Sequence, residues 1–460
     1  MNARALKSFA ISLSLCIAVA NLSAQSTVTT LHSFAGQPAR GNFPGGLVQG
    51  NDGNFFGTTY AEGTNQEGTI FRMSPSGVYT NLHTFGSSSP NDGAYPNAGL
   101  TLGSDGNFYG TTENGGINPG GYGYGTVYRI SPSGDYSTII NFDMTNGEGY
   151  SPYAGLVQGS DGIFYGTTLQ SELFSNGVAL YGGMVFSVSS SGAFRPLHYF
   201  GIIAGDGYNP FSGVVQGHDG YFYGAAPRGG TNNDGIVYRV ATDGGYSILH
   251  TFAGPPNEGY FAAAGLTLGN DGNFYGTTQS GGMNNNAGTI FRVSPGGDFT
   301  NLYSFGSFAG DGVQPNAPLV LGRDGNFYGT TTYGGQGNAG TVFRISPGGV
   351  YTNLYSFGLV TGEGNSPYAP LVLGRDGSFY GIATAGGTNN YGTIFKLTIP
   401  TVLNCQNLGN AVVLSWNDPL SVLQSAPAVT GTYTNVPSAT SPYTNTLTGP
   451  QQFFRLQVSQ

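Results

Sequence analysis

Short apolar segments separated by glycine-rich turns recur along most of the chain. In one stretch, apolar and aromatic residues dominate positions 100–103, 108–111, 126–130 and 136–142. The turns at 104–106 and 131–134 contain Asp-Gly and Pro-x-Gly, in which Asp can accept backbone N–H bonds and Gly can adopt a positive φ. Segments of this length joined by such turns predict four antiparallel strands. Their weak polar alternation indicates strands that are covered on both faces.

This four-strand pattern is one copy of a repeat. The string Asp-Gly-x-aromatic-aromatic-Gly begins at seven aspartates spaced 52 to 58 residues apart: Asp52, Asp105, Asp161, Asp219, Asp271, Asp324 and Asp376. Units of about fifty residues without a helical period are typical of β-propeller blades. The sequence therefore predicts an all-β fold with a seven-bladed β-propeller at 25–399. An open β-solenoid is the alternative.

The seventh unit predicts how the ring closes. After residues 393–397 the chain continues into Pro400 with no turn and no fourth strand. Residues 28–34 near the N-terminus match the fourth strand at 351–357 in pattern. We expect the N-terminal strand to complete the seventh blade, because the pairing would remove two exposed sheet edges.

Residues 1–24 predict a secretory signal peptide. Arg4 and Lys7 precede an apolar run at 9–20, and small residues lead to a cleavage site after Ala24. The run is too short to span a bilayer comfortably, so we expect a secreted protein, extracellular or periplasmic, with no membrane span in the mature chain. Cys405 would then be the only cysteine, which excludes an intramolecular disulfide.

Composition limits the classes of partner. The 460 residues include 38% hydrophobic and 8% charged residues, with a formal charge of −9 that becomes −11 once the two basic residues of 1–24 are removed. This balance favours a folded protein over a disordered one. Nucleic acid is excluded as a partner, because no basic stripe could neutralise phosphates. We expect a monomer.

The recurring blocks also carry a family resemblance. Gly-Leu-Val-x-Gly-x-Asp-Gly-Asn-Phe-Tyr-Gly-Thr-Thr is followed, in fixed order, by Gly-Thr-Ile/Val-Phe-Arg-Ile-Ser-Pro-x-Gly across residues 26–399. This pattern resembles the bacterial secreted tandem-repeat family nicknamed GloVer. The resemblance implies an exported, propeller-like protein. It supplies no established activity and no catalytic residues.

A separate module follows the repeats at 400–460. Segments 411–416, 421–424 and 452–456 read as strands, and Trp416 is the only tryptophan. About 60 residues can form a small β-sandwich-like module with a marginal core. The module loosely resembles the terminal fibronectin-like modules of other exported bacterial proteins.

The sequence contains no nucleophile elbow, His-Glu-x-x-His, paired-Cys metal set or phosphate loop, so we expect no cofactor, no metal and no catalytic residues. Four histidines occupy one position of the fourth strand in different blades, where they would point away from each other rather than converge on a metal: His32, His83, His198 and His250. The seven turn aspartates lack the further acidic ligands of a calcium loop. A basic residue recurs in the third strand and predicts a polar contact within each blade: Arg72, Arg129, Arg239, Arg292, Arg344 and Lys396.

The candidate binding site lies on one face of the predicted propeller. Tight turns follow the first and third strands on one face (the turn face), and variable loops follow the second and fourth strands on the other (the loop face). An acid followed by Gly recurs in the loops after the fourth strand: Asp92, Glu148, Asp206, Glu258, Asp311 and Glu363, with Arg40-Gly41 in the first unit. Aromatic residues accompany them: Tyr95, Tyr150 and Tyr208, with Phe43, Tyr153, Phe211, Tyr260 and Tyr368. These residues could bind a glycan or a cationic partner. Alternatively, each acid could cap its own loop.

Two functions follow from this interpretation. We favour a non-enzymatic exported protein that binds a polysaccharide, an envelope component or a protein partner through the loop face. The alternative is a polysaccharide lyase or hydrolase, which would need one or two units to depart from the repeat with a convergent catalytic set.

Overall fold

The computed structural model describes residues 25–35, 44–86, 92–117, 123–143, 149–171, 173–175, 178–180, 182–401, 403–408, 411–416, 421–446 and 452–458. They form strands, turns and loops, with no helix. The chain divides into two compact units, one of which is Ser26–Ile399, while the other contains Pro400–Gln460. The predicted signal peptide at 1–24 lies outside the described residues.

Seven antiparallel sheets of four or five strands form most of the larger unit, and we call them the repeat sheets. Each of the first six has four strands that pair in chain order. Sheet 1 contains β2 (Pro44–Gln49), β3 (Phe55–Thr59), β4 (Thr69–Met73) and β5 (Tyr79–Thr84). Sheet 2 contains β7 (Thr101–Leu102), β8 (Phe108–Thr112), β10 (Thr126–Ile130) and β11 (Tyr136–Asn141). Sheet 3 contains β12 (Val157–Gln158), β13 (Phe164–Thr168), β16 (Met184–Val188) and β17 (Phe194–Tyr199).

The remaining repeat sheets follow the same order. Sheet 4 contains β19 (Val215–Gln216), β20 (Phe222–Ala226), β22 (Ile236–Val240) and β23 (Tyr246–Thr251). Sheet 5 contains β25 (Thr267–Leu268), β26 (Phe274–Thr278), β28 (Thr289–Val293) and β29 (Phe299–Ser304). Sheet 6 contains β31 (Val320–Leu321), β32 (Phe327–Thr331), β34 (Thr341–Ile345) and β35 (Tyr351–Ser356). Sheet 7 contains β36 (Gly364–Pro367), β37 (Val372–Leu373), β38 (Phe379–Gly386), β39 (Thr393–Thr398) and β1 (Thr27–Ser33).

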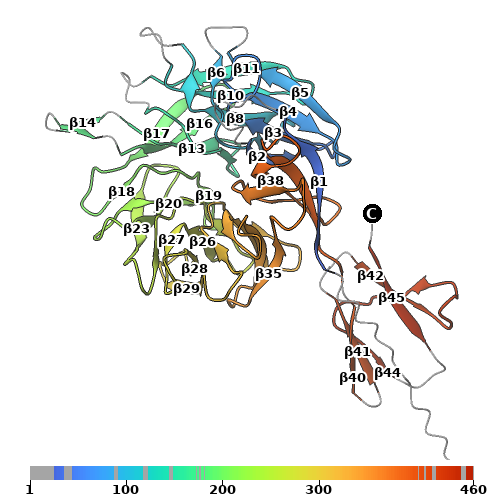
Figure 1. The fold of residues 1–460 in the computed structure, drawn as a ribbon. Helices are drawn as coiled ribbons and strands as arrows, with labels where there is room; N and C mark the ends of the chain where they lie inside the picture. Colours follow the sequence, from blue (N-terminus) through green and yellow to red (C-terminus); the bar gives the residue numbers. More distant parts are fainter. Residues whose placement is uncertain are drawn as a thin grey trace, which may run out of the picture. The chain divides into compact units, whose positions relative to one another are not determined.

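The N-terminal strand supplies the outer strand of sheet 7. β1 runs antiparallel to β39, from Thr27 opposite Thr398 to Ser33 opposite Thr393, with an irregularity between Thr30 and His32. In Figure 1 the blue β1 lies beside the orange strands of sheet 7, among them β38, and the repeat sheets are arranged in a ring. The larger unit is therefore a propeller-like arrangement of antiparallel sheets.

Aromatic stacking between neighbouring sheets explains why the Asp-Gly-x-aromatic-aromatic-Gly string repeats. The second aromatic residue of each string stacks on the first aromatic residue of the next, with ring centroids 3.8–4.2 Å apart. The stacks run from Phe56–Phe108 in sheets 1 and 2 through to Tyr380–Phe55, which joins sheet 7 to sheet 1. Second strands such as β8 are buried along their whole length, because sheets cover both of their faces.

Hydrogen bonds from threonine hydroxyls also join neighbouring repeat sheets near the centre of the ring. The Thr58 hydroxyl donates to the Ala98 carbonyl at 2.8 Å, and the Thr111 hydroxyl donates to the Ala154 carbonyl at 2.9 Å. Each bond links a second strand to the segment that leads into the first strand of the next sheet. The inner residues of neighbouring sheets are thereby held in a fixed arrangement.

Small two-stranded sheets connect the loops. Four of them pair the loop after a fourth strand with the loop after the following second strand: β6 (Gly93–Ala94) with β9 (Asn114–Gly115), β18 (Gly207–Tyr208) with β21 (Arg228–Gly229), β24 (Gly259–Tyr260) with β27 (Ser280–Gly281), and β30 (Gly312–Val313) with β33 (Tyr333–Gly334). A fifth joins β14 (Leu173–Ser175) to β15 (Val178–Leu180). The first four pairings place both sets of loops on one face.

The smaller unit contains two three-stranded sheets. One has the order β40 (Asn404–Asn407), β41 (Ala411–Ser415), β44 (Tyr443–Thr446), and the other has the order β43 (Thr434–Asn435), β42 (Ser421–Ala426), β45 (Phe453–Val458). Leu414, Trp416 and Leu423 belong to one buried cluster that draws residues from both sheets. Cys405 is a free thiol. Across the described part of the chain, no helix is long and apolar enough to cross a membrane.

Candidate functional site

The predicted acids of the loop face accept hydrogen bonds from their own unit, and Asp206 also accepts one from Tyr246 of the next sheet. Asp206, which is 1% exposed, is the clearest case. Its carboxylate lies 3.1 Å from His198 Nε2 and accepts bonds from the Tyr246 hydroxyl at 2.7 Å and from the Gly201 N–H at 2.9 Å. Burial would raise the pKa of Asp206, but the hydrogen bonds from His198 and Tyr246 outweigh it, so the pKa lies below its ordinary value.

The other described acids occupy the same position. Asp92 lies 3.1 Å from His83 Nε2, and Glu258 lies 3.0 Å from His250 Nε2. In the two units with Tyr in place of His, the Tyr hydroxyl donates to the acid: Tyr303 to Asp311 and Tyr355 to Glu363. Backbone N–H groups of the same loops also donate to these carboxylates. Glu148 and Arg40-Gly41 lie outside the described residues.

The three predicted tyrosines are spread over the loop face. Tyr95 contacts the Tyr60 ring at 5.0 Å between centroids, and Tyr150 contacts Tyr124 edge-on at 5.7 Å. Tyr208 is 41% exposed. The structure therefore brings each described acid to a His or Tyr of its own unit, with Tyr246 of the next sheet added at Asp206, and does not gather the described acids at one point. Ligand binding by these acids and tyrosines stays a prediction.

The glycine of each acid-Gly pair has a steric role. In the small sheets, Gly259 faces Gly281 and packs on the second strand, where an added Cβ would lie 1.7 Å from the Thr278 hydroxyl oxygen. Gly93 would likewise bring a Cβ within 2.3 Å of the Thr112 hydroxyl oxygen. The acid-Gly repeat thus combines a loop-capping acid with a residue that allows two loops to approach the sheet.

The repeated aspartates and bases of the turn face are also internally bonded. Asp271 accepts from the Asn273 N–H at 3.2 Å and from the Tyr275 hydroxyl at 2.8 Å. In sheet 4 the Arg239 Nε donates to the Ser247 hydroxyl at 3.0 Å. These contacts lie within one sheet or its turn, whereas Arg239 Nη1 also donates to the Pro295 carbonyl in the turn of sheet 5 at 3.5 Å. No group of three potential His, Cys, Asp or Glu metal ligands occurs in the part of the chain that is described.

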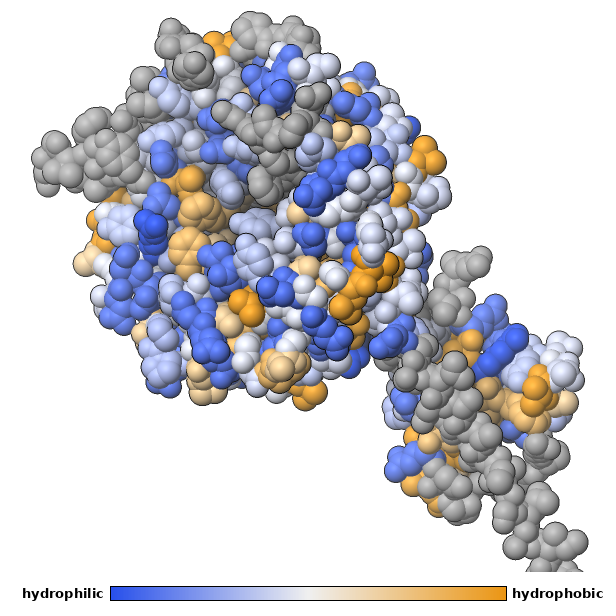
Figure 2. Space-filling model, in the orientation of Figure 1, coloured by the Kyte–Doolittle hydropathy of each residue, from blue (hydrophilic) through white to orange (hydrophobic). Residues whose placement is uncertain are grey.

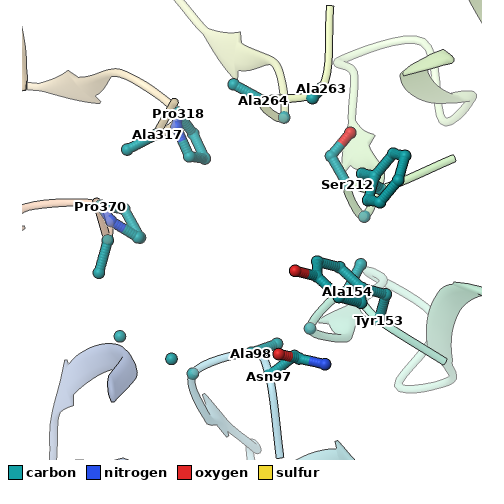
Figure 3. A pocket seen from close by; sticks show the side chains of 18 of the residues that line it. Asn97, Ala98, Tyr153, Ala154, Ser212, Ala263, Ala264, Ala317, Pro318 and Pro370 are labelled. Atoms are coloured by element: carbon teal, nitrogen blue, oxygen red, sulfur yellow. The ribbon is translucent and has the colours of Figure 1, made fainter. Parts of the chain in front are cut away.

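A cavity of about 1010 Å³ lies at the centre of the repeat sheets. Its wall is formed by small residues that lie in β2 or precede the first strands of the other repeat sheets: Gly45, Gly46, Ala98, Gly99, Ala154, Gly155, Ser212, Gly213, Ala264, Gly265, Ala317, Pro318, Ala369 and Pro370. A Cβ added at Gly45 would lie 2.5 Å from the Asn97 carbonyl oxygen, so neighbouring segments approach too closely for larger residues. Figure 3 shows these small residues arranged around the hollow.

The other residues that line this cavity differ from unit to unit. One set directly precedes the small residues and includes Asn97, Tyr153, Phe211, Ala263, Asn316 and Tyr368. A second set directly follows the second strands and includes Tyr60, Glu113 and Gln279. Tyr153 directs its hydroxyl into the hollow, with Asn97 nearby at the edge (Figure 3). Figure 2 shows hydrophobic residues in separate spots around the central hollow rather than in one broad patch.

Aromatic rings and amides dominate this variable lining. Tyr153 and Phe211 meet edge-on with centroids 5.3 Å apart, and Phe211 lies 6.0 Å from Phe261. Burial, together with the nearby Tyr368, Glu113 and Tyr60, raises the pKa of Tyr153 to about 12. The Tyr153 hydroxyl therefore stays protonated at neutral pH and can donate a hydrogen bond.

Sequence reasoning included Tyr153, Phe211 and Tyr368 among the aromatic residues of the loops but missed the cavity that they line. A signal existed at the position after the Thr-Thr pair of the second strand, which is Ala-Ala in sheet 4 and Ile-Ala in sheet 7. That position holds Tyr60, Glu113, Leu169, Pro227, Gln279, Thr332 and Thr384 in the seven units. Its variation within an otherwise regular repeat could have indicated a site.

The repeat pattern matches a known family. The family model described as the Gloeobacter/Verrucomicrobia repeat matches residues 18–181, 172–358 and 213–408. These three overlapping matches cover most of the chain. No curated protein matches the sequence.

Two solved structures are similar in fold. The extracellular domain of the BT3049 protein from B. thetaiotaomicron has a TM-score of 0.51 and 10% identity, covering 94% of this chain and 55% of that structure. The present chain therefore spans about half of its length. The BP39L lectin from Burkholderia pseudomallei has a TM-score of 0.50 and 11% identity, covering 86% of this chain and 98% of the lectin chain. At such identities the likeness concerns the fold alone.

Proposed function

The chain belongs to the Gloeobacter/Verrucomicrobia repeat family, and from this premise we propose that it is an exported, non-enzymatic binding protein whose central cavity takes a carbohydrate. The family match and the propeller-like fold leave the ligand open, because one fold can carry many functions. The proposal therefore rests on the residues of the cavity. The lectin and the extracellular domain among the similar structures are consistent with it.

The finer architecture is part of the proposal. We take the seven repeat sheets as blades of one closed propeller, with β1 completing the seventh blade. The continuous set of aromatic stacks from sheet 1 to sheet 7 and back supports this arrangement. We take the module at 400–460 as β-sandwich-like, on the evidence of its two sheets and their shared apolar cluster.

The observation that carries the function is the uneven lining of a regular cavity. A sugar ring has apolar C–H faces and hydroxyl edges, which match aromatic rings and amide side chains respectively. Tyr153, Phe211 and Tyr368 supply rings, and Asn97 and Gln279 supply amides. The volume of about 1010 Å³ lies at the upper end of the ~300–1,000 Å³ usual for small-molecule pockets, so more than one sugar ring could enter.

The catalytic alternative receives less support from the same residues. Most glycoside hydrolases use two facing carboxyl groups. Among the described residues that line the cavity, Glu113 is the single carboxylate. Polysaccharide degradation is therefore kept as an outcome of the experiment rather than as a second proposal.

A glycan-array screen with two matched variants tests the proposal. Tyr368 lines the cavity and is 47% exposed, whereas Tyr333 lies in β33 outside it and is 48% exposed. We expect Tyr368→Ala to weaken binding of the best glycan about tenfold, corresponding to ~1.4 kcal/mol for a lost stacking ring, and Tyr333→Ala to leave it unchanged.

Three results would decide against the proposal. Wild-type protein that retains no glycan on the array would remove its basis. Equal losses in Tyr368→Ala and Tyr333→Ala would place binding outside the cavity. Shortening of the bound polysaccharide over time, followed by chromatography, would favour the enzyme.

A further inference from the structure

The cavity carries one charge, and its position is unique within the repeat. At the position that Glu113 occupies, directly after the Thr-Thr, Ala-Ala or Ile-Ala pair, the other six units have uncharged residues. No Lys, Arg or His is among the described residues that line the cavity. The cavity is therefore electrostatically asymmetric, with negative charge on the side of sheet 2.

The Glu113 carboxylate is held in place through one oxygen. Its Oε2 accepts a bond from Asn97 Nδ2 at 2.5 Å and a longer one from the Tyr60 hydroxyl at 3.4 Å. Its Oε1 accepts no hydrogen bond from the described part of the chain. This differs from the loop-face acids such as Asp206, where both oxygens are bonded within the unit. One oriented oxygen of Glu113 is available to a ligand.

Aromatic rings border the same side of the cavity. The Tyr60 hydroxyl donates to Glu113. Besides burial, the charges of Glu113, Tyr60 and Tyr368 each contribute to the raised pKa of the Tyr153 hydroxyl, so all three lie near it. The faces of tyrosine rings attract cations, and a carboxylate attracts them further. The net charge of −9 adds a long-range attraction for positive ligands.

We propose that the central cavity prefers glycans whose sugars carry a protonated primary amine, with the ammonium group placed at Glu113 among Tyr60, Tyr153 and Tyr368. This inference rests on the proposed carbohydrate-binding function and specifies its ligand class. Uronates and sulfated sugars are disfavoured, because the cavity lining offers a carboxylate and no described base to receive their negative charge.

Calorimetric titration with two oligosaccharides of equal length tests the preference. One is a glucosamine oligomer, and the other is the corresponding N-acetylglucosamine oligomer, which has the same rings and no positive charge. At a pH where the amine is protonated, we expect the wild-type protein to bind the glucosamine oligomer about tenfold more tightly. Glu113→Gln should remove this preference, so that its affinities for the two oligomers differ by less than about twofold.

Asp243→Asn is the matched control for charge. Asp243 is exposed in the turn between β22 and β23, so this variant changes the net charge by the same amount on the turn face. The control should keep the full preference. Glu113→Asp, which retains the charge, should keep part of it, and unchanged melting temperatures would establish that each variant is folded.

The outcomes separate this inference from the function on which it rests. Equal binding of the two oligomers by wild-type protein and by Glu113→Gln would overturn the amine preference and leave carbohydrate binding intact. Binding of spermidine as tightly as the glucosamine oligomer would also overturn the inference, because the sugar would then contribute nothing. Failure of both oligomers, together with an empty glycan array, would overturn the proposed function itself.

Discussion

The carboxylates of the loop face and the carboxylate of the cavity occupy opposite environments. Asp206 is 1% exposed and receives bonds from a histidine, a tyrosine and two backbone N–H groups. Glu113 receives bonds at one oxygen and leaves the other open in the described structure. Asp206 belongs to a set that recurs around the ring, and Glu113 is unique. In this protein a repeated polar residue builds the unit, while a residue that breaks the repeat is the better candidate for function.

The largest expected effect comes from removing a repeated carboxylate. Asp206→Asn places an amide where four donors converge, so at least one N–H must lose its acceptor. We expect the free energy of unfolding to fall by about 2–4 kcal/mol. Urea unfolding followed by circular dichroism measures this change.

Glu113→Gln is the paired variant for this experiment. The side chain is half-buried and bonded at one oxygen, so we expect a change within about 0.5 kcal/mol. Equal losses of unfolding free energy in Asp206→Asn and Glu113→Gln would contradict the view that Asp206 stabilises the fold and that Glu113 is free to bind a ligand.

The pH dependence sharpens the same contrast. The pKa of Asp206 lies below its ordinary value of 3.8, because hydrogen bonds from His198 and Tyr246 outweigh the effect of burial. The stability that it contributes is therefore complete above the pKa of the unfolded chain and is lost as the pH falls through the lower pKa of the folded protein. We expect the difference in unfolding free energy between wild type and Asp206→Asn to shrink as the pH is lowered from about 6 to below about 4.

Unfolding curves of both proteins across this pH range measure the effect. A difference in unfolding free energy that stays constant down to the lowest pH would show that the charged form of the Asp206 carboxylate does not stabilise the folded protein. Asp271, whose pKa is also lowered, provides an independent site for the same measurement.

The pairing of the acids with His or Tyr could not be predicted with the same ease as the strands. The turns around Asp105 and the apolar segments that follow are local features, so they are legible in the sequence. His198 and Asp206 are separated by a loop, and their spacing alone does not predict that the loop brings the two side chains within hydrogen-bond distance. Their meeting depends on the path of the loop.

The cavity was missed for a related reason. Tyr60, Glu113 and Gln279 lie in different units and become neighbours of one space only when the sheets stand in a ring. The small residues Ala98-Gly99 and Ala154-Gly155 indicate, from the sequence alone, positions near the centre where segments pack closely. Which variable residues project over them depends on the loops, and that could not be predicted from the pattern of strands.

A smaller effect is expected at the glycines that accompany the acids. Gly259→Ala would place a Cβ 1.7 Å from the Thr278 hydroxyl oxygen, so the loop or the second strand must shift. We expect a loss of about 1–3 kcal/mol in unfolding free energy. The melting temperature, measured by calorimetry, reports the loss.

Gly272→Ala is the control for backbone strain alone. Gly272 has a φ of +78°, and no atom lies within 4 Å of the added Cβ, so the variant tests conformation without a clash. We expect about 1 kcal/mol there. A Gly259→Ala protein as stable as the wild type would show that this approach of loop and sheet is not tight in solution.

The smallest effect concerns a departure within the repeated turns themselves. Asp52 and Asp271 both accept bonds from an Asn two residues later, but only Asp271 also accepts one from a tyrosine hydroxyl, at 2.8 Å, because Phe56 stands where Tyr275 does. We expect Asp271→Ala to cost about 1 kcal/mol more than Asp52→Ala, the usual net value of one hydrogen bond. Tyr275→Phe should lower the unfolding free energy of the wild-type protein by this same amount. In the Asp271→Ala background it should cause no further loss, and a double-mutant cycle of unfolding free energies measures both changes. Equal costs at Asp52 and Asp271 would mean that the tyrosine bond contributes nothing to the turn. The ring stacking that both units share would then be sufficient reason for the aromatic pair.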